Sequence, residues 1–319
     1  MQTASKKVIN GWTMYDWANS AYSLIITSAI FPAYYTAIAP AQVHMFGRVF
    51  DRSALASYAI SFSFLLIACI SPILSSIADY KGNKKAFMQF FTYVGSAACC
   101  SMFFFTKDNI SFGIIASVVA SIGYCGSIVF YNAYLPEIAA EEDQDRISAK
   151  GFTMGYIGSV LLMIVCLAAI MMNDKMNLGW GAYPARLSFL AVGIWWAGFA
   201  QITFNRLPPS KIPEQHAEYN LFTNGFHELK KVWFELKHHP NLSKFLRGFF
   251  FYNMGVQTVM YLATYFASDE LKMESSQLII TVLIIQIVAI LGATLFSKLS
   301  DKTNNIFTLC TLICIWILI

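Results

Sequence analysis

Charged side chains are scarce in this sequence. Lys, Arg, Asp and Glu make up 13% of its 319 residues, about half of the share that is usual in a soluble domain. They are absent from eight stretches, each close to or longer than the roughly 20 residues that a helix needs to cross a bilayer. These stretches are 17–50 (interrupted by Arg48), 53–78, 86–106, 109–136, 151–173, 187–205, 248–268 and 275–297. The pattern excludes a soluble globular domain and predicts eight complete transmembrane helices.

A ninth apolar run begins near Ile306 and continues to Ile319. As a helix this run would span about 21 Å, less than the roughly 30 Å of a bilayer's hydrocarbon core. We therefore expect the chain to stop inside or just across the membrane, as a fragment or a truncated gene product would.

Lys and Arg are unevenly divided between the two sides that this topology defines. With the N-terminus in the cytoplasm, the inner segments hold 16 of them and the outer segments hold 6. An excess of Lys and Arg marks cytoplasmic loops, so the sequence predicts a multi-pass protein with a cytoplasmic N-terminus. We expect it in the cell membrane, with a vacuolar membrane as the alternative.

Several kinds of chemical site have no support in the sequence. The seven cysteines lie in apolar runs and form no C-x-x-C pair, which is typical of buried apolar side chains. The motifs H-E-x-x-H, G-x-S-x-G and G-x-x-x-x-G-K-[ST] do not occur, and no basic cluster with interleaved aromatics indicates nucleic-acid binding. The sequence therefore predicts no catalytic residue, no metal, no cofactor and no nucleic-acid partner.

A polar stretch, 206–243, separates a first bundle of six helices (1–205) from a partial second bundle (244–319). Prolines near its start exclude a continuous helix. Beyond them, apolar residues recur at spacings of 4, 3, 4 and 3, which predicts an amphipathic helix on the inner membrane surface. These residues are Phe222, Phe226, Leu229, Trp233 and Leu236. The alternative is a plain linker with an accidental apolar stripe.

Two loops repeat one pattern. The segment SSIADYKGNKK (75–85) follows the second helix, and SKLSDKTNN (297–305) follows the eighth. Both place an aspartate, Asp79 or Asp301, where an apolar helix ends, followed by lysine and small polar residues. Their positions correspond if helices seven and eight repeat helices one and two. The sequence then predicts two six-helix halves, as in a large class of secondary transporters.

At these residues the chain resembles the major facilitator superfamily. The superfamily motif G-x-x-x-D-x-x-G-R-K is matched by Ser75, Asp79, Gly82, Asn83 and Lys84, with Ser for the first Gly and Asn for the Arg. Other segments resemble its UMF1 branch, which is related to the vacuolar effluxer Atg22. They are YDWANSAY (15–22), the stretch from LPEIA to SAKGFTMGYIGS (135–159) and YNMGVQT (252–258).

The resemblance implies an all-α integral membrane fold of the major facilitator type, with a six-helix N-terminal half and an incomplete C-terminal half. It also implies transport of a small solute across the lipid bilayer, and the vacuolar relative suggests amino acids. Met254 stands where the family usually has Asp, so any role for a carboxylate at that point is lost.

Polar side chains in two apolar helices are candidates for a solute site, because polar groups in lipid are costly unless paired or wetted. In each helix they share one face, and the two helices hold equivalent places in the two halves. We expect these residues to line a central cavity: Asp16, Asn19 and Ser23 in helix one, and Asn253, Gln257 and Tyr261 in helix seven. The alternative is that they bond only to neighbouring helices. Asp16, flanked by Trp12 and Trp17, could instead anchor helix one at the cytoplasmic rim.

A second group of candidates lies at the cytoplasmic ends of helices. An aspartate there can accept hydrogen bonds from neighbouring helix N-termini or pair with a cation. Such a latch would favour the state closed to the cytoplasm. The predicted latch residues are Asp79, Gly82, Lys84, Glu137, Arg146 and Asp301. The simpler alternative is that the lysines set only the topology.

The sequence leaves three functions open. It favours a secondary active transporter that works by alternating access, and it leaves open whether a coupling proton drives transport. The first alternative is a polytopic membrane enzyme, in which the pair His238–His239 would be the first residues to test. The second alternative is a truncated membrane protein that does not transport.

Overall fold

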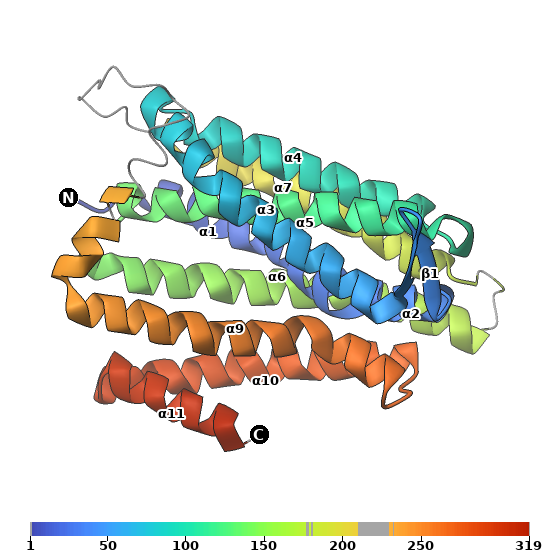
Figure 1. Cartoon of the computed structure of the whole chain (residues 1–319). Helices are drawn as coiled ribbons and strands as arrows, with labels where there is room; N and C mark the ends of the chain where they lie inside the picture. Colours follow the sequence, from blue (N-terminus) through green and yellow to red (C-terminus); the bar gives the residue numbers. More distant parts are fainter. Residues whose placement is uncertain (1, 177–178, 180, 210–229, 232, 319) are drawn as a thin grey trace.

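The structure is a computed structural model that describes residues 2–176, 179, 181–209, 230, 231 and 233–318 (Figure 1). Its N-terminal part contains α1 (Lys6–Ala21), the π-helix η1 (Tyr22–Ala29), α2 (Ile30–Ile38), α3 (Arg52–Lys81), α4 (Lys84–Ser101), α5 (Ile110–Ile138), α6 (Glu141–Met176) and α7 (Tyr183–Arg206). Its C-terminal part contains α9 (Pro240–Asp269), α10 (Ser275–Lys302) and α11 (Asn305–Leu318). The short elements are β1 (Gln42–Met45), β2 (Arg48–Asp51), η2 (Met102–Phe104) and η3 (Lys107–Asn109).

In the described part of the chain, six helical segments are long and apolar enough to cross a membrane. They are Lys6–Ile38, Arg52–Ser75, Lys84–Phe104, Ile110–Ile138, Glu141–Asn173 and Tyr183–Arg206. The helices α9 and α10, with 30 and 28 residues, also have the length of a crossing and are drawn below α6 in Figure 1. The all-helical membrane fold that the charge spacing predicts is therefore confirmed. The predicted amphipathic helix falls mostly on residues 210–229 and 232, which lie outside the described part.

The first crossing is not a regular α-helix. Its middle eight residues, η1, form a π-helix, in which each backbone N–H bonds five residues back instead of four. The Ser28 hydroxyl supports the wide turn by donating to the Ser23 carbonyl at 3.1 Å. A π-turn holds more residues than an α-turn, so side chains in η1 point in directions that a 3.6-residue period does not predict.

The segment after α2 forms a hairpin that the sequence did not predict. The strands β1 and β2 pair antiparallel, from Gln42↔Asp51 to Met45↔Arg48. At the tip, Phe46 and Gly47 have φ of 50° and 73°, as a two-residue type I′ turn requires. The uncharged stretch 17–50 is therefore helical only as far as α2.

Close helix packing in the N-terminal part depends on glycine. Gly95 of α4 faces Gly123 of α5, and a Cβ on Gly123 would lie 2.5 Å from the Gly95 Cα. The obstacle is backbone, which cannot rotate away as a flexible side chain can. Small residues at such positions are what lets transmembrane helices approach closely.

Replacing Gly123 by alanine should therefore destabilise the bundle. We expect Gly123→Ala to cost about 1–3 kcal/mol, because the added methyl forces α4 and α5 apart. Thermal unfolding in detergent micelles measures this as a lower Tm. The matched control is Gly198→Ala in α7, whose Cβ would meet nothing within 4 Å. If the two variants unfold at the same temperature, close α4–α5 packing does not limit stability.

Candidate functional site

The two ends of the bundle carry different features (Figure 1). The end that carries the N-terminus, the turn between α3 and α4, and the end of α7 is called the N-terminal side. The end that carries β1, β2 and the end of α9 is called the hairpin side.

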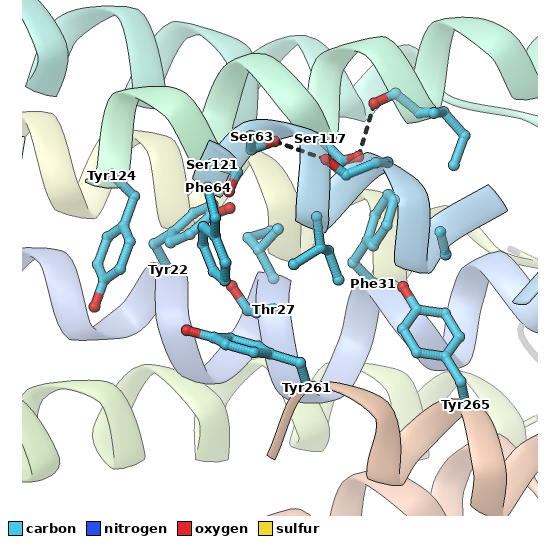
Figure 2. A pocket seen from close by; sticks show the side chains of 15 residues that line it. Tyr22, Thr27, Phe31, Ser63, Phe64, Ser117, Ser121, Tyr124, Tyr261 and Tyr265 are labelled. Atoms are coloured by element: carbon cyan, nitrogen blue, oxygen red, sulfur yellow. Dashed lines mark hydrogen bonds between the residues drawn. The ribbon is translucent and has the colours of Figure 1, made fainter. Parts of the chain in front are cut away.

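A small cavity lies where α9 meets the N-terminal helices, and Figure 2 shows its lining. Its volume is ≈ 30 Å³, far below that of a small-molecule pocket. The rings in its wall are Tyr22, Phe31, Phe64, Tyr124, Tyr261 and Tyr265, and its hydroxyl groups include Thr27, Ser63, Ser117 and Ser121. In Figure 2, Tyr261 and Tyr265 reach from α9 toward the N-terminal helices. No charged residue is among the described residues that line this cavity.

A larger groove of ≈ 590 Å³ lies between α3 and α9, which is the size of a small-molecule pocket. Asn253, Gln257 and Tyr261 all line it, so the three polar residues singled out on helix seven share one surface. Phe64 and Tyr261 border both the groove and the small cavity, with ring centroids 5.2 Å apart. This aromatic pair therefore forms part of the wall between the two spaces.

The last third of α9 is attached to the N-terminal helices. Thr264 donates to the Ser28 carbonyl at 2.5 Å, and Ser268 donates to the Thr36 hydroxyl at 2.9 Å. Nearer the start of α9, apolar side chains are exposed, as Phe250 is at 61%. In the part of the chain that the structure describes, the polar and ring contacts of α9 with the N-terminal helices are all made toward the hairpin side.

An ion pair completes this contact at its outermost point. Arg52 begins α3 and Asp269 ends α9, and Arg52 Nε donates to Asp269 Oδ1 at 3.1 Å, with Nη2 bonded to the same oxygen. The Ser53 hydroxyl donates to the other carboxylate oxygen. Arg52 Nη1 donates to the Thr36 carbonyl at 2.8 Å, so one guanidinium joins α2, α3 and α9. Both charged side chains are about one quarter exposed, at 24% and 23%.

Asp16 is buried within the N-terminal helices. Its carboxylate accepts a hydrogen bond from the Tyr131 hydroxyl at 2.6 Å. On α6, Gly151 makes room for it, because a Cβ there would overlap the carboxylate. No Lys, Arg or His among the described residues forms an ion pair with Asp16. An ionisable group in this setting is a functional-site candidate, because burying a charge in a membrane without a partner is costly.

The sequence of the whole chain places it among known proteins. Residues 4–319 match the family described as vacuole effluxer Atg22 like. The chain belongs to this Atg22-like family. It is 33% identical to the MFS-type transporter YxiO of Bacillus subtilis (strain 168), over 92% of the chain and 67% of that relative. It is 24% identical to autophagy-related protein 22-1 of Aspergillus terreus, over 73% of the chain and 50% of that relative. No solved structure matches.

The family is described as effluxer-like and the bacterial relative is named as a transporter of the major facilitator type, so the family to which this chain belongs is one of membrane transporters. The relatives also confirm the predicted fold class, a membrane bundle of this superfamily. The chain spans about half the length of the fungal relative and about two thirds of the bacterial one.

In this Atg22-like chain, the six residues predicted to line one cavity do not all line the same space. Asn253, Gln257 and Tyr261 line the groove, but Asp16 and Asn19 are not among the residues that line either space. Asn19 is 1% exposed, and its Nδ2 has no hydrogen-bond partner among the described residues. Ser23 reaches the small cavity only indirectly, through its hydroxyl's interaction with the Tyr124 phenol. Asp16 and Asn19 lie on the regular helix α1 and are buried among the N-terminal helices, where Asp16 contacts Tyr131 of α5 and Gly151 of α6.

The predicted latch residues make their described ion pairs within the N-terminal part. Lys84 pairs with Glu137, which joins the start of α4 to the end of α5. Arg146 pairs with Asp143 on its own helix at 2.6 Å. Neither pair reaches α9, α10 or α11 in this conformation. The side chains of Asp79 and Asp301 lie outside the described residues.

Gly82 has a backbone role in the turn that follows α3. Its φ is 63°, and the Asn83 N–H bonds back to the Ala78 carbonyl at 2.9 Å. This six-to-one bond around a left-handed glycine is how many helices end. The glycine of the superfamily motif therefore fixes the sharp change of direction between α3 and α4.

No sequence pattern indicated the residues that join the two parts. Arg52 and Asp269 each border an uncharged stretch, and a charge at such a position usually marks only the membrane boundary. The two residues are also 217 positions apart, so spacing does not connect them. One general feature of the sequence, its 16 tyrosines, was consistent with an aromatic cavity wall. Composition does not say which tyrosines meet, so Tyr22, Tyr124 and Tyr265 were missed.

Proposed function

We propose that this chain acts as a secondary active transporter that moves a small solute by alternating access. In such a mechanism two helical bundles, here 1–205 and 244–319, pivot about a site between them. The observation that carries the proposal is the attachment of α9 at its hairpin end, beside a groove of ≈ 590 Å³ lined by its earlier residues. A conformation closed at the hairpin side and open toward the N-terminal side accounts for both features.

The distribution of Lys and Arg supports an orientation for this conformation. The excess of these residues on the N-terminal side favours the cytoplasm for that side. We therefore propose that the groove faces the cytoplasm in this conformation and that the protein works in the cell membrane.

The lining favours a solute with little net charge. Among the described residues, both spaces present aromatic, hydroxyl and amide groups and no charged side chain. Amino acids are the class we propose first, because a zwitterion has no net charge and its polar ends can bond with the Asn253 and Gln257 amides. The aromatic wall at Phe64 and Tyr261 would face the apolar part of such a solute.

We further propose that Asp16 carries a coupling proton. The titratable groups that interact with it are three phenols, Tyr15, Tyr124 and Tyr131, which are ordinarily neutral near pH 7. No described cation fixes the charge of the carboxyl, and Gly151 lets α1 and α6 approach closely at this point. A shift of α1 against α6 would change the surroundings of the Asp16 carboxyl and therefore its affinity for a proton.

Transport of labelled amino acids by the protein in lipid vesicles tests the solute site. Tyr261→Ala removes a ring from the wall, and Gln257→Ala removes an amide from the groove. Each should raise KM about tenfold, which corresponds to about 1.4 kcal/mol of binding. Val259→Ala, on the exposed side of the same helix, is the matched control and should leave KM unchanged. An unchanged KM in both site variants contradicts this site, and a failure to move any amino acid contradicts the solute class.

A further inference from the structure

A separate cavity of ≈ 420 Å³ opens on the hairpin side. It lies between the end of α2, the start of η3 and the start of α7. Two of its lining residues, Lys107 and Arg186, are cations, and none of its described lining residues is acidic. Neither cation forms an ion pair with a described residue. The cavity therefore holds two positive charges that no described carboxylate balances.

The guanidinium of Arg186 is held in a fixed position. Its Nε donates to the Phe103 carbonyl at 2.5 Å. Its central carbon lies 5.0 Å from the Phe103 ring centroid and 6.0 Å from the Tyr183 ring centroid. Nε is used by this contact, and the two terminal nitrogens keep N–H groups in one plane. Such a planar fork matches two oxygens of a phosphate group.

The start of α7 adds a third source of positive potential. Its N-cap residue, Ala182, lines the cavity and has no side chain that can cap the helix. In the first turn of α7, Pro184 has no N–H, and the N–H groups of Tyr183 and Ala185 have no partner within the helix. They carry the positive end of the helix dipole, which attracts anions. The backbone, Arg186 and Lys107 thus favour the same sign of charge in one cavity.

We propose that this cavity binds a phosphate group, which either a phospholipid headgroup or free phosphate could supply. Two tyrosines, Tyr34 and Tyr183, line the same cavity, and tyrosine is enriched at the headgroup level of membranes. The Tyr34 hydroxyl donates to the Phe105 carbonyl at 2.8 Å, so this wall is fixed. The proposal does not depend on the solute site, because no residue of this cavity lines the groove or the small cavity between α9 and the N-terminal helices.

Binding to the delipidated full chain in detergent tests the proposal with two probes. Inorganic phosphate is titrated at constant ionic strength against chloride, with Tm as the readout. Dioleoylphosphatidylglycerol is titrated by native mass spectrometry, with dioleoylglycerol, which lacks the phosphate, as the matched lipid. Binding of both probes supports a free-phosphate site, and binding of the phospholipid alone supports a headgroup site.

Three variants locate the site. Arg186→Gln should weaken binding of the probe about tenfold or more, because hydrogen bonds to charged groups are strong. Lys107→Gln should weaken it several-fold, and it keeps the test valid if Arg186→Gln does not fold. Arg48→Gln removes an exposed cation of β2 that does not line the cavity, and it should leave binding unchanged. The proposal is overturned if neither probe binds, or if all three variants lose affinity equally.

Discussion

Asp269→Arg should strongly reduce accumulation of solute, and adding Arg52→Asp should restore part of it. The single substitution places two guanidinium groups where the structure has an ion pair. Because the pair is about one quarter exposed, its loss should cost roughly 1–2 kcal/mol, between the surface and buried cases. That changes the ratio of two conformations by about 5- to 30-fold. The state closed at the hairpin side should become rarer, and the double variant should regain attraction between the same two helices.

Labelling of the cavity separates this effect from simple misfolding. Ser63→Cys lines the small cavity and is introduced into a chain whose seven native cysteines are replaced. A membrane-impermeant maleimide added at the hairpin side should label it faster in Asp269→Arg and more slowly again in the double variant. Glu270→Arg changes the charge of the adjacent exposed residue and is the matched control. Equal labelling of the parent chain and Asp269→Arg would mean that the ion pair does not hold this side closed.

The membrane-spanning helices could be predicted because burying a charge in lipid is costly at every position of a crossing. Each crossing therefore appears in the sequence as a long uncharged stretch. The uncharged stretch 187–205 lies within α7, which the structure places at Tyr183–Arg206. The same rule failed between Ala39 and Phe50, because a hairpin needs no charge and its turn depends on the two residues Phe46 and Gly47. Segment averages do not resolve a feature of that size.

Spacing along one helix predicted which polar side chains share a face, but not what that face meets. On α9 a spacing of four residues holds, and Asn253, Gln257 and Tyr261 reach one groove. Asp16 and Asn19 lie on the regular helix α1, yet both are buried among the N-terminal helices. Which helices a face packs against depends on the whole bundle, and the sequence of one helix does not contain that information.

Pairs between distant helices were beyond prediction for a related reason. Arg52 with Asp269, and Asp16 with Tyr131, are each joined by packing of whole helices and not by local spacing. A search by spacing finds residues on one helix face, as it did for α9. It cannot choose a partner 115 or 217 positions away.

Asp16→Asn should uncouple transport from a pH gradient while leaving exchange of solute intact. Asparagine has nearly the same shape as the acid, and it can still accept a hydrogen bond from the Tyr131 hydroxyl. It cannot bind or release a proton near neutral pH, so a proton gradient can no longer do work through this residue. In vesicles with an imposed pH gradient, the solute should therefore reach only equal concentrations on the two sides. Exchange of labelled for unlabelled solute should continue, because it requires no net proton movement.

Two further variants decide what the acid does. Glu142→Gln removes an exposed carboxylate at the start of α6 and should leave accumulation unchanged, which controls for loss of negative charge. Tyr131→Phe removes the hydrogen bond but keeps the carboxyl, so it should shift the pH dependence of accumulation without abolishing it. If Asp16→Asn still accumulates solute against its gradient, Asp16 carries no coupling proton. If Asp16→Asn also stops exchange, the carboxyl is needed to hold α1, α5 and α6 together, and its role is structural.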